Sequence, residues 1–255
     1  MGKICPRVRP EKVMYGYSHA IVIGASSGIG EQLVRQLVID GTLVAAVARR
    51  SDRLDTLAQD YPGQVIPIPH DVTDFGAVPA LFQEITKQLG GLDLVIYAAG
   101  VMPEVGENEY SFEKDRQMVD VNLLGAIAWL NQAALRFSNT HSGTIVGIGS
   151  VAGERGRHGQ PVYNTTKAAL ATFLEALRNR LSRHGVRVVT IKPGPTATEM
   201  TAHLYSKGMM SPTLTAAIIL NKSKKNGEFF IKFTHKIAFL IIRNIPSGIF
   251  RKLKI

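Results

Sequence analysis

The sequence predicts an α/β protein with a single Rossmann-type, doubly wound parallel sheet and helices on both faces. Short, nearly all-apolar runs alternate with amphipathic stretches through most of the chain, and a glycine-rich turn joins the first run to the first amphipathic stretch. Alternation of this kind implies right-handed crossovers between parallel strands. With 255 residues and 45% hydrophobic content, the chain can bury one sizeable core.

The apolar runs are rich in β-branched residues, as expected for strands covered on both faces. These strands are predicted at residues 19–24, 43–48, 65–69, 92–98, 144–149 and 186–192, with a seventh at 227–233. Helices are predicted between them at residues 28–40, 52–61, 74–89, 112–137 and 161–184. The expected organisation is a basic arm (1–17), one catalytic domain (18–233) and a basic amphipathic C-terminal segment (234–255).

The net charge of +10 lies at the two ends of the chain. Residues 1–12 carry +3 and residues 222–255 carry +8, whereas residues 13–221 carry −1. A neutral body argues against a nucleic-acid-binding fold. The single Cys5 cannot form an internal disulfide, no Cys or His cluster has the spacing of metal ligands, and no apolar stretch follows the basic N-terminus. We therefore expect a cytoplasmic protein without a metal.

The glycine-rich turn after the first strand predicts a dinucleotide site. Glycine allows a tight turn and close backbone approach, and the start of the next helix offers free N–H groups and a positive dipole end to a pyrophosphate. The strand–turn–helix context favours this function over an empty, strained turn. The residues expected to contact the nucleotide here are Gly24, Ser26, Ser27, Gly28, Ile29 and Gly30.

Arg49 and Arg50 end the second strand, where an acidic residue would hold the ribose hydroxyls of NAD. Arginine can instead pair with a 2′-phosphate, so NADP(H) is preferred and NAD(H) stays open. For Arg50 the alternative is an ordinary surface charge at a helix start. Asp71 and Val72 follow the third strand and are placed to meet the adenine edge, although Asp71 could equally cap a turn.

Tyr163 and Lys167 have the spacing of an acid–base pair. At i, i+4 on a helix they lie on one face, where the ammonium could bring the phenol pKa down from about 10 toward neutral pH. Ser150, thirteen residues before Tyr163 at the end of a strand, could hold the oxygen of a reacting carbonyl. The alternative for the pair alone is an incidental contact on a solvated helix face.

Taken together, Gly24-x-x-x-Gly28-x-Gly30, Asn122, Ser150, Tyr163-x-x-x-Lys167 and Pro193-Gly194 resemble the classical short-chain dehydrogenase/reductase (SDR) family over residues 18–200. The resemblance implies that Tyr163 is the general acid/base, that Ser150 positions the substrate oxygen, and that Lys167 binds the nicotinamide ribose and lowers the tyrosine pKa. It also implies that Asn122 anchors a water linking Lys167 to solvent; from its residue type alone, Asn122 could be a helix bend or a buried hydrogen bond.

The resemblance further implies that the segment after the sixth strand contacts the nicotinamide carboxamide and the phosphates. The cofactor residues that it adds are Ala99, Gly100, Pro193, Gly194, Thr196 and Thr198. The chain departs from the family at Tyr97 and Ala98, where the family has Asn-Asn, and at Ile23, where threonine is frequent. Because the family's asparagine ties neighbouring strands together, this departure concerns the hydrogen bonding of the sheet rather than catalysis.

Residues 199–211 are expected to form a short apolar flap that suits a hydrophobic or bulky ketone, unless its Met200, Leu204, Met209 and Met210 merely fill gaps. Residues 235–255 are too interrupted for a membrane-spanning helix. This segment could lie on an anionic membrane surface as a peripheral contact, or dock on the protein body or a second subunit. The family resemblance favours a homodimer or homotetramer.

We therefore expect an NADPH-dependent carbonyl reductase, or the reverse alcohol dehydrogenase. It would transfer hydride between the nicotinamide and a small-molecule ketone, aldehyde or secondary alcohol. The alternatives are a catalytically silent nucleotide-sensing protein and a membrane-surface scaffold of the same fold. An intact Ser, Tyr, Lys and Asn set argues against a pure sensor, which has no need of an acidic phenol.

Overall fold

The computed structural model describes residues 15–203 and 208–253. Most of the predicted basic arm, Leu204 of the predicted flap and the last two residues of the chain therefore lie outside the described residues. Tyr15 and Tyr17, at the end of the arm, are buried against the body.

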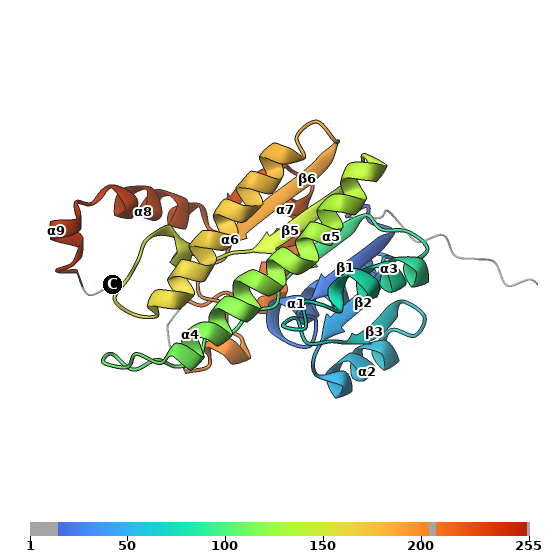
Figure 1. Ribbon diagram of the computed structural model, residues 1–255, viewed down its shortest axis with the longest axis horizontal. Helices are drawn as coiled ribbons and strands as arrows, with labels where there is room; N and C mark the ends of the chain where they lie inside the picture. Colours follow the sequence, from blue (N-terminus) through green and yellow to red (C-terminus); the bar gives the residue numbers. More distant parts are fainter. Residues whose placement is uncertain (1–14, 204–207, 254–255) are drawn as a thin grey trace, which may run out of the picture.

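One seven-stranded parallel sheet forms the centre of the molecule, with strand order β3-β2-β1-β4-β5-β6-β7 (Figure 1). The order reverses between β1 and β4, whose carboxyl ends flank the crevice where ligands bind in doubly wound sheets. The predicted fold class and strands are confirmed. The strands are β1 (His19–Ile23), β2 (Leu43–Ala48), β3 (Val65–Pro69), β4 (Leu94–Tyr97), β5 (Gly143–Ile148), β6 (Val186–Lys192) and β7 (Gly227–Phe230).

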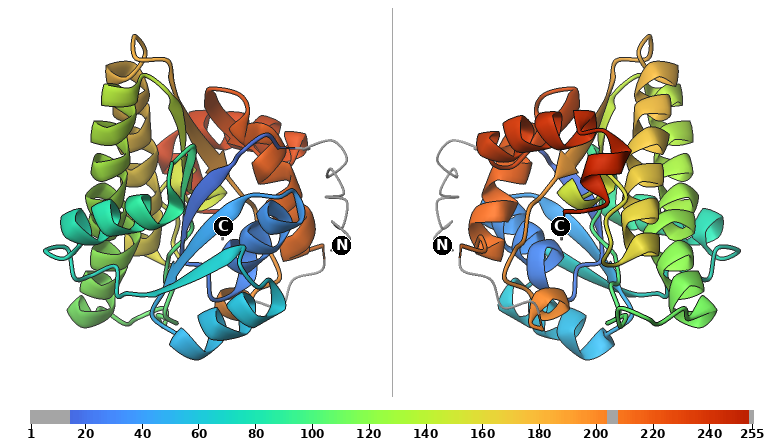
Figure 2. Two further views of the ribbon diagram at one scale, coloured as in Figure 1. Left: turned by 90° about the vertical axis from the view of Figure 1, so that its right-hand side faces the viewer. Right: turned by 90° about the vertical axis from the view of Figure 1, so that its left-hand side faces the viewer.

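Helices cover both faces of the sheet and enclose two apolar cores (Figure 2). On one face pack α3 (Val78–Leu89), α5 (Gly125–Thr140) and α6 (Pro161–Arg180). On the other pack α1 (Gly28–Ile39), α2 (Ser51–Asp60) and α7 (Pro212–Ser223). The strands are buried on both sides, which is why their sequences read as continuous apolar runs.

The predicted long helix at 112–137 is α4 (Phe112–Val119) continued through a π-helical turn (Asp120–Leu124) into α5. Its 29 residues are long and apolar enough to cross a membrane by length and composition. Trp129 and Phe137 are nevertheless fully buried against the sheet, as expected of a core helix. Single π-helical turns of this kind often mark functional sites, and this one carries Asn122.

Tyr97 connects β4 to the π-helical turn. Its hydroxyl donates a 2.5 Å hydrogen bond to the carbonyl of Val121, and Gly125 leaves room for the hydroxyl because a Cβ there would lie 2.5 Å from it. Burial, and to a lesser degree the charge of Asp71, raise the pKa of Tyr97, so it stays a hydrogen-bond donor. The residue that departs from the family pattern thus makes a polar tie of its own, to the helix rather than to a neighbouring strand.

Three helices, α7, α8 and α9, lie in the last part of the described chain. Helix α7 begins at Pro212 with Ser211 as its N-cap and packs on α1; the sequence analysis missed it. Helix α8 (Phe233–Asn244) and the short α9 (Ser247–Phe250) follow β7 and extend from the carboxyl end of the sheet (Figure 1).

Replacing Tyr97 with Phe should destabilise the protein by about 1–3 kcal/mol, because the carbonyl of Val121 loses its buried donor. Urea unfolding followed by circular dichroism measures this free energy. Tyr110→Phe is the matched control, because Tyr110 is 94% exposed. Equal unfolding midpoints for the two variants would show that the Tyr97 hydroxyl contributes nothing to stability.

Candidate active site

The glycine turn passes so close to its neighbours that side chains are excluded. Gly24 adopts φ +90°, and a Cβ on it would collide with the backbone of Ala99, while a Cβ on Gly30 would collide with the carbonyl of Gly24. Ser27 is the N-cap of α1, yet its side chain makes no capping hydrogen bond, so it satisfies none of the first N–H groups of that helix. The turn therefore fits the pyrophosphate of a dinucleotide.

Arg50 lies across this turn. Its guanidinium donates to the hydroxyls of Ser26 (3.1 Å) and Ser27 (2.6 Å). The Glu199 carboxylate pairs with Arg50 at 2.9 Å and with Arg53 at 3.1 Å, and these contacts, led by the hydrogen bond from Arg50, lower the pKa of Glu199. The structure thus gives Arg50 and Arg53 a common anion, so Arg50 is not an isolated surface charge at a helix start.

Arg49 and Asp71 pair with each other at the end of β2 and β3. Arg49 reaches the Asp71 carboxylate at 3.6 Å, and Asp71 accepts from the backbone and hydroxyl of Thr73 at 2.9 and 2.8 Å. Burial raises the pKa of Asp71, but these hydrogen bonds and the charge of Arg49 outweigh it and keep that pKa below its usual value. Asp71 therefore caps a turn, the alternative that its residue type left open.

Ser150, Tyr163 and Lys167 meet at the carboxyl end of β5. Ser150 follows that strand, caps the 3-10 helix Val151–Glu154 and accepts from the N–H of Ala152 at 3.0 Å. Lys167 is buried, donates to the carbonyl of Ile148 at 3.0 Å, and lies with its Nζ 5.7 Å from the centre of the Tyr163 ring. The i, i+4 spacing on α6 thus places the two side chains together.

Burial dominates the electrostatics of this pair. It raises the pKa of Tyr163 above its ordinary value, while a hydrogen bond with Ser150 and the charge of Arg157 act in the opposite direction without cancelling it. Burial also lowers the pKa of Lys167 to about 8. The direction at Tyr163 is opposite to the one expected from sequence, because desolvation of the phenolate outweighs the nearby cations. A phenol that keeps its proton suits donation to a carbonyl oxygen.

Asn122 is fully buried and bonded on both sides of its amide. Its Oδ1 accepts from the N–H of Val101 at 2.7 Å, and its Nδ2 donates to the carbonyl of Val101 at 3.0 Å and to the hydroxyl of Thr166 at 3.3 Å. It therefore fastens the segment after β4 to α6, at the residue next to Lys167. Its role as the anchor of a water stays a prediction.

A cavity of about 570 Å³ opens at this edge of the sheet. Asp71 and Asn122 are the predicted site residues that do not line it. Those that do are Gly24, Ser26, Ser27, Gly28, Ile29, Gly30, Arg49, Arg50, Val72, Ala99, Gly100, Ser150, Tyr163, Lys167, Pro193, Gly194, Thr196 and Thr198. Met200 of the predicted flap also lines the cavity, whereas Met209 and Met210 do not.

Among the residues of the cavity wall that the sequence analysis missed are Arg157, His235 and Phe239. Arg157 donates weakly to Asn164 at 3.4 Å, and its buried Nε has no hydrogen-bond partner among the described residues. His235 and Phe239 line the wall from α8, and His235 packs so tightly on Gly194 that a Cβ there would collide with the imidazole. The i, i+4 spacing of His235 and Phe239 could have predicted from the sequence that both lie on the same face of a helix.

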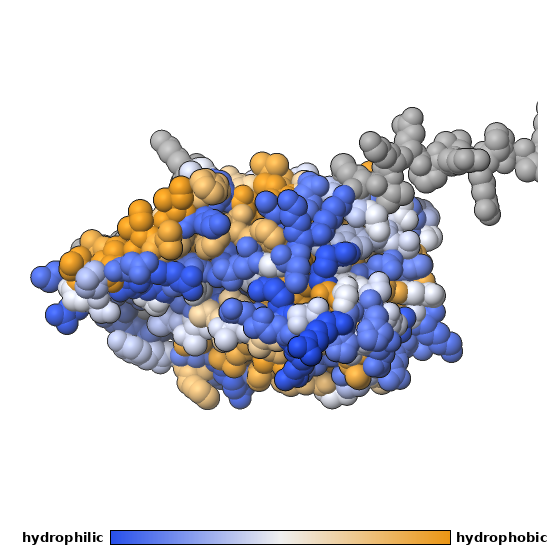
Figure 3. Space-filling view, turned by 90° about the horizontal axis from the view of Figure 1, so that it is seen from above, coloured by the Kyte–Doolittle hydropathy of each residue, from blue (hydrophilic) through white to orange (hydrophobic). Residues whose placement is uncertain are grey.

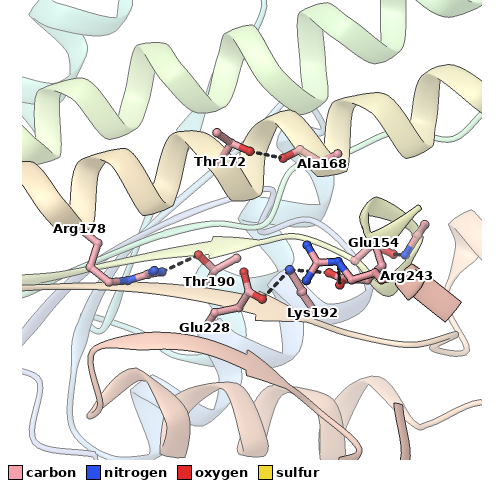
Figure 4. Close-up of polar contacts among 10 residues, drawn as sticks. Glu154, Ala168, Thr172, Arg178, Thr190, Lys192, Glu228 and Arg243 are labelled. Atoms are coloured by element: carbon pink, nitrogen blue, oxygen red, sulfur yellow. Dashed lines mark hydrogen bonds and ion pairs between the residues drawn. The ribbon is translucent and has the colours of Figure 1, made fainter. Parts of the chain in front are cut away.

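Helix α8 is fastened to the segment after Ser150 by a cluster of charges, of which Lys192 and Glu154 are buried (Figure 4). Lys192, at the end of β6, pairs with Glu154 and with Glu228 (2.6 Å), and Arg243 of α8 pairs with Glu154 at 3.3 Å. Arg155 donates to the carbonyl of Ile242, and its guanidinium lies 4.0 Å from the centre of the Phe250 ring.

The model of the short chain dehydrogenase family matches residues 18–208. The chain belongs to the short-chain dehydrogenase/reductase family. A relative, an uncharacterised oxidoreductase of Myxococcus xanthus strain DK1622, is 34% identical over 226 residues, covering 87% of this chain and 89% of its own length. An uncharacterised oxidoreductase of Staphylococcus aureus strain N315 is 33% identical over 184 residues, covering 72% of this chain and 80% of its own.

Solved structures show the same SDR fold. A short-chain dehydrogenase from Streptomyces avermitilis superposes with a TM-score of 0.80 at 24% identity, covering 89% of this chain and 92% of that one. A short-chain dehydrogenase from Burkholderia cenocepacia in complex with NADP gives 0.81 at 21% identity, with 94% and 98% covered. This SDR protein is an NAD(P)-dependent dehydrogenase or reductase.

The rate of carbonyl reduction should fall as the pH rises through about 8, because Lys167 then loses its proton and its charge. The unfolded chain keeps this proton to about pH 10.5. Between these values the unfolded state binds more protons, so the contribution of Lys167 to stability rises with pH and unfolding does not explain the loss. The measurement is kcat/KM against pH, which reports the free enzyme.

Lys167→Arg is the control for this profile, since a guanidinium stays charged over the whole range. Its activity should be lower but flat above pH 8. A descending limb that persists unchanged in Lys167→Arg would show that another group causes it.

Proposed function

We propose that this SDR protein is an NADPH-dependent carbonyl reductase for hydrophobic ketones or aldehydes, working in reverse as an alcohol dehydrogenase. The observation that carries the proposal is one cavity lined at one end by the glycine turn and elsewhere by Ser150 and Tyr163. A cytoplasmic setting and a homodimer or homotetramer stay proposals, supported by the lone Cys5 and by the family resemblance.

The residues present fit a dinucleotide. A Cβ at Gly24 or Gly30 would collide with neighbouring backbone, so only glycine allows the tight path of this turn, and the amides at the start of α1 would hold the pyrophosphate. Pro193, Gly194 and Thr196 would bind the nicotinamide end, with Lys167 beside its ribose. When bound, the nicotinamide supplies the hydride.

The side chains of the protein align the carbonyl and provide the proton. Ser150 would donate a hydrogen bond to the carbonyl oxygen, and Tyr163, whose raised pKa keeps it protonated, would give that oxygen its proton. Arg157 and Lys167 place positive charge near the phenol and stabilise the phenolate left behind. Met102, Val151, Met200 and Phe239 line the same cavity and support an apolar substrate.

Preference for NADPH rests on the arginines beside the glycine turn. Arg50 and Arg53 already share an anion, the Glu199 carboxylate, so the position suits a 2′-phosphate. The similar Burkholderia cenocepacia protein was solved with NADP, which supports the same choice here. A 2′-phosphate would compete with Glu199 for these guanidinium groups.

Tyr163→Phe should lower kcat for ketone reduction at least about a hundredfold, because the proton donor is removed. The measurement is NADPH oxidation over ketones and aldehydes of rising chain length. NADPH binding, followed by nicotinamide fluorescence, should stay close to wild type, and Tyr110→Phe should be fully active. A phenylalanine variant as fast as its parent would rule out the catalytic assignment.

Arg50→Gln should raise KM for NADPH by about tenfold to a hundredfold and leave KM for NADH nearly unchanged, since only NADPH presents the extra phosphate. Glu199→Gln should have the opposite effect on NADPH, because it removes the competing carboxylate. Both constants come from initial rates with one ketone. If Arg50→Gln weakened both nucleotides equally, Arg50 would support the turn without selecting the phosphate.

A further inference from the structure

Helix α8 is apolar on two sides. His235, Phe239 and Ile242 are half-buried on its inner side, and the first two line the cavity. The outer side carries an apolar strip that continues beyond α9, and its members are between 39% and 71% exposed. The strip consists of Phe233, Ile237, Leu240, Ile241, Ile249 and Leu253.

The strip is the outward face of a docked helix. Arg243 pairs with Glu154, and Arg155 binds the carbonyl end of α8 and stacks on Phe250. Figure 3 shows apolar residues gathered over the end of the molecule where Figure 1 places α8 and α9. Contiguous exposed apolar residues on a folded surface indicate a binding face.

The charged residues of the segment that carries the strip are all positive. Residues 232–253 contain five Lys or Arg and no Asp or Glu. Lys232 bonds to a backbone carbonyl and Arg243 pairs with Glu154, whereas Lys236, Arg251 and Lys252 are exposed and form no ion pair with the described residues. Apolar side chains bordered by uncompensated cations fit the anionic head groups and acyl boundary of a bilayer.

A second copy of the chain fits the strip poorly. In a two-fold contact the same patch faces itself, so the cations bordering one strip would meet those of the other with no acid between them. We propose that α8 and α9 form a peripheral membrane-binding surface that docks the protein on anionic bilayers. This surface goes beyond the proposed function and does not depend on turnover.

Flotation of the full chain with vesicles tests the proposal. The protein should bind vesicles of phosphatidylcholine mixed with phosphatidylglycerol, should bind pure phosphatidylcholine far less, and should dissociate as salt rises. Ile241→Glu should weaken binding at least about tenfold, because it places a charge where an exposed apolar side chain would enter the bilayer. Lys236→Gln and Lys252→Gln should each weaken it about fivefold.

Ile39→Glu is the matched control, since Ile39 is 75% exposed at the end of α1, away from the strip, and its variant should bind like wild type. Circular dichroism and NADPH oxidation with a water-soluble ketone should be unchanged in Ile241→Glu. If the wild type did not oxidise NADPH with that ketone, the proposed function would be wrong, but the membrane surface would be unaffected.

Two outcomes would overturn the membrane surface. The first is that the wild type binds neither kind of vesicle, and the second is that Ile39→Glu and Ile241→Glu lose binding equally. In the first case, a molecular mass that falls in Ile241→Glu, measured by light scattering, would place a second copy of the chain on the strip instead.

Discussion

The ion pair between Lys192 and Glu154 joins the parts of the molecule on which the cavity depends. Both side chains are almost completely buried, at 4% and 1% exposure. Because both charges are removed from water, losing either partner would leave an uncompensated charge in the interior. Here Glu228 supplies a second carboxylate to Lys192, and Arg243 neutralises the other oxygen of Glu154. These ion pairs thereby connect β6 and β7 to the segment after Ser150 and to α8.

The same low-polarity surroundings govern the catalytic residues. Burial favours the neutral forms of Tyr163 and Lys167, so the phenol keeps its proton and the lysine pKa comes down to about 8. Arg157 then matters more than its sequence context suggests, because a guanidinium stays charged where an ammonium loses its proton. A site of this kind is set for donating a proton to a carbonyl oxygen, with the cations balancing the charge that donation leaves on the phenol.

The sequence predicted the strands and the glycine turn well because those features are local, resting on apolar runs and on backbone positions that only glycine can occupy. It could not show that Arg50 and Arg53 share the carboxylate of Glu199, which lies about 150 residues away in the chain. It missed α7, whose apolar residues follow directly on an apolar flap without a clear polar face. Tyr97 could be flagged as a departure from the family pattern, but its bond to Val121 depends on packing across the sheet.

The sequence left two alternatives for the C-terminal segment, docking on the protein body and lying on a membrane. These alternatives are compatible, because they concern opposite sides of α8. A helix with His235, Phe239 and Ile242 on one side and apolar residues at 233, 237, 240 and 241 on the other cannot bury both sides against one partner. The inner side is held on the body and walls the cavity; the outer side needs a second apolar environment. If that environment is a bilayer, the cavity lies beside the phase into which an apolar ketone partitions, so docking would raise the concentration of substrate near the mouth of the site. The membrane surface and the substrate preference would then have one physical origin in the two-sided hydrophobicity of α8.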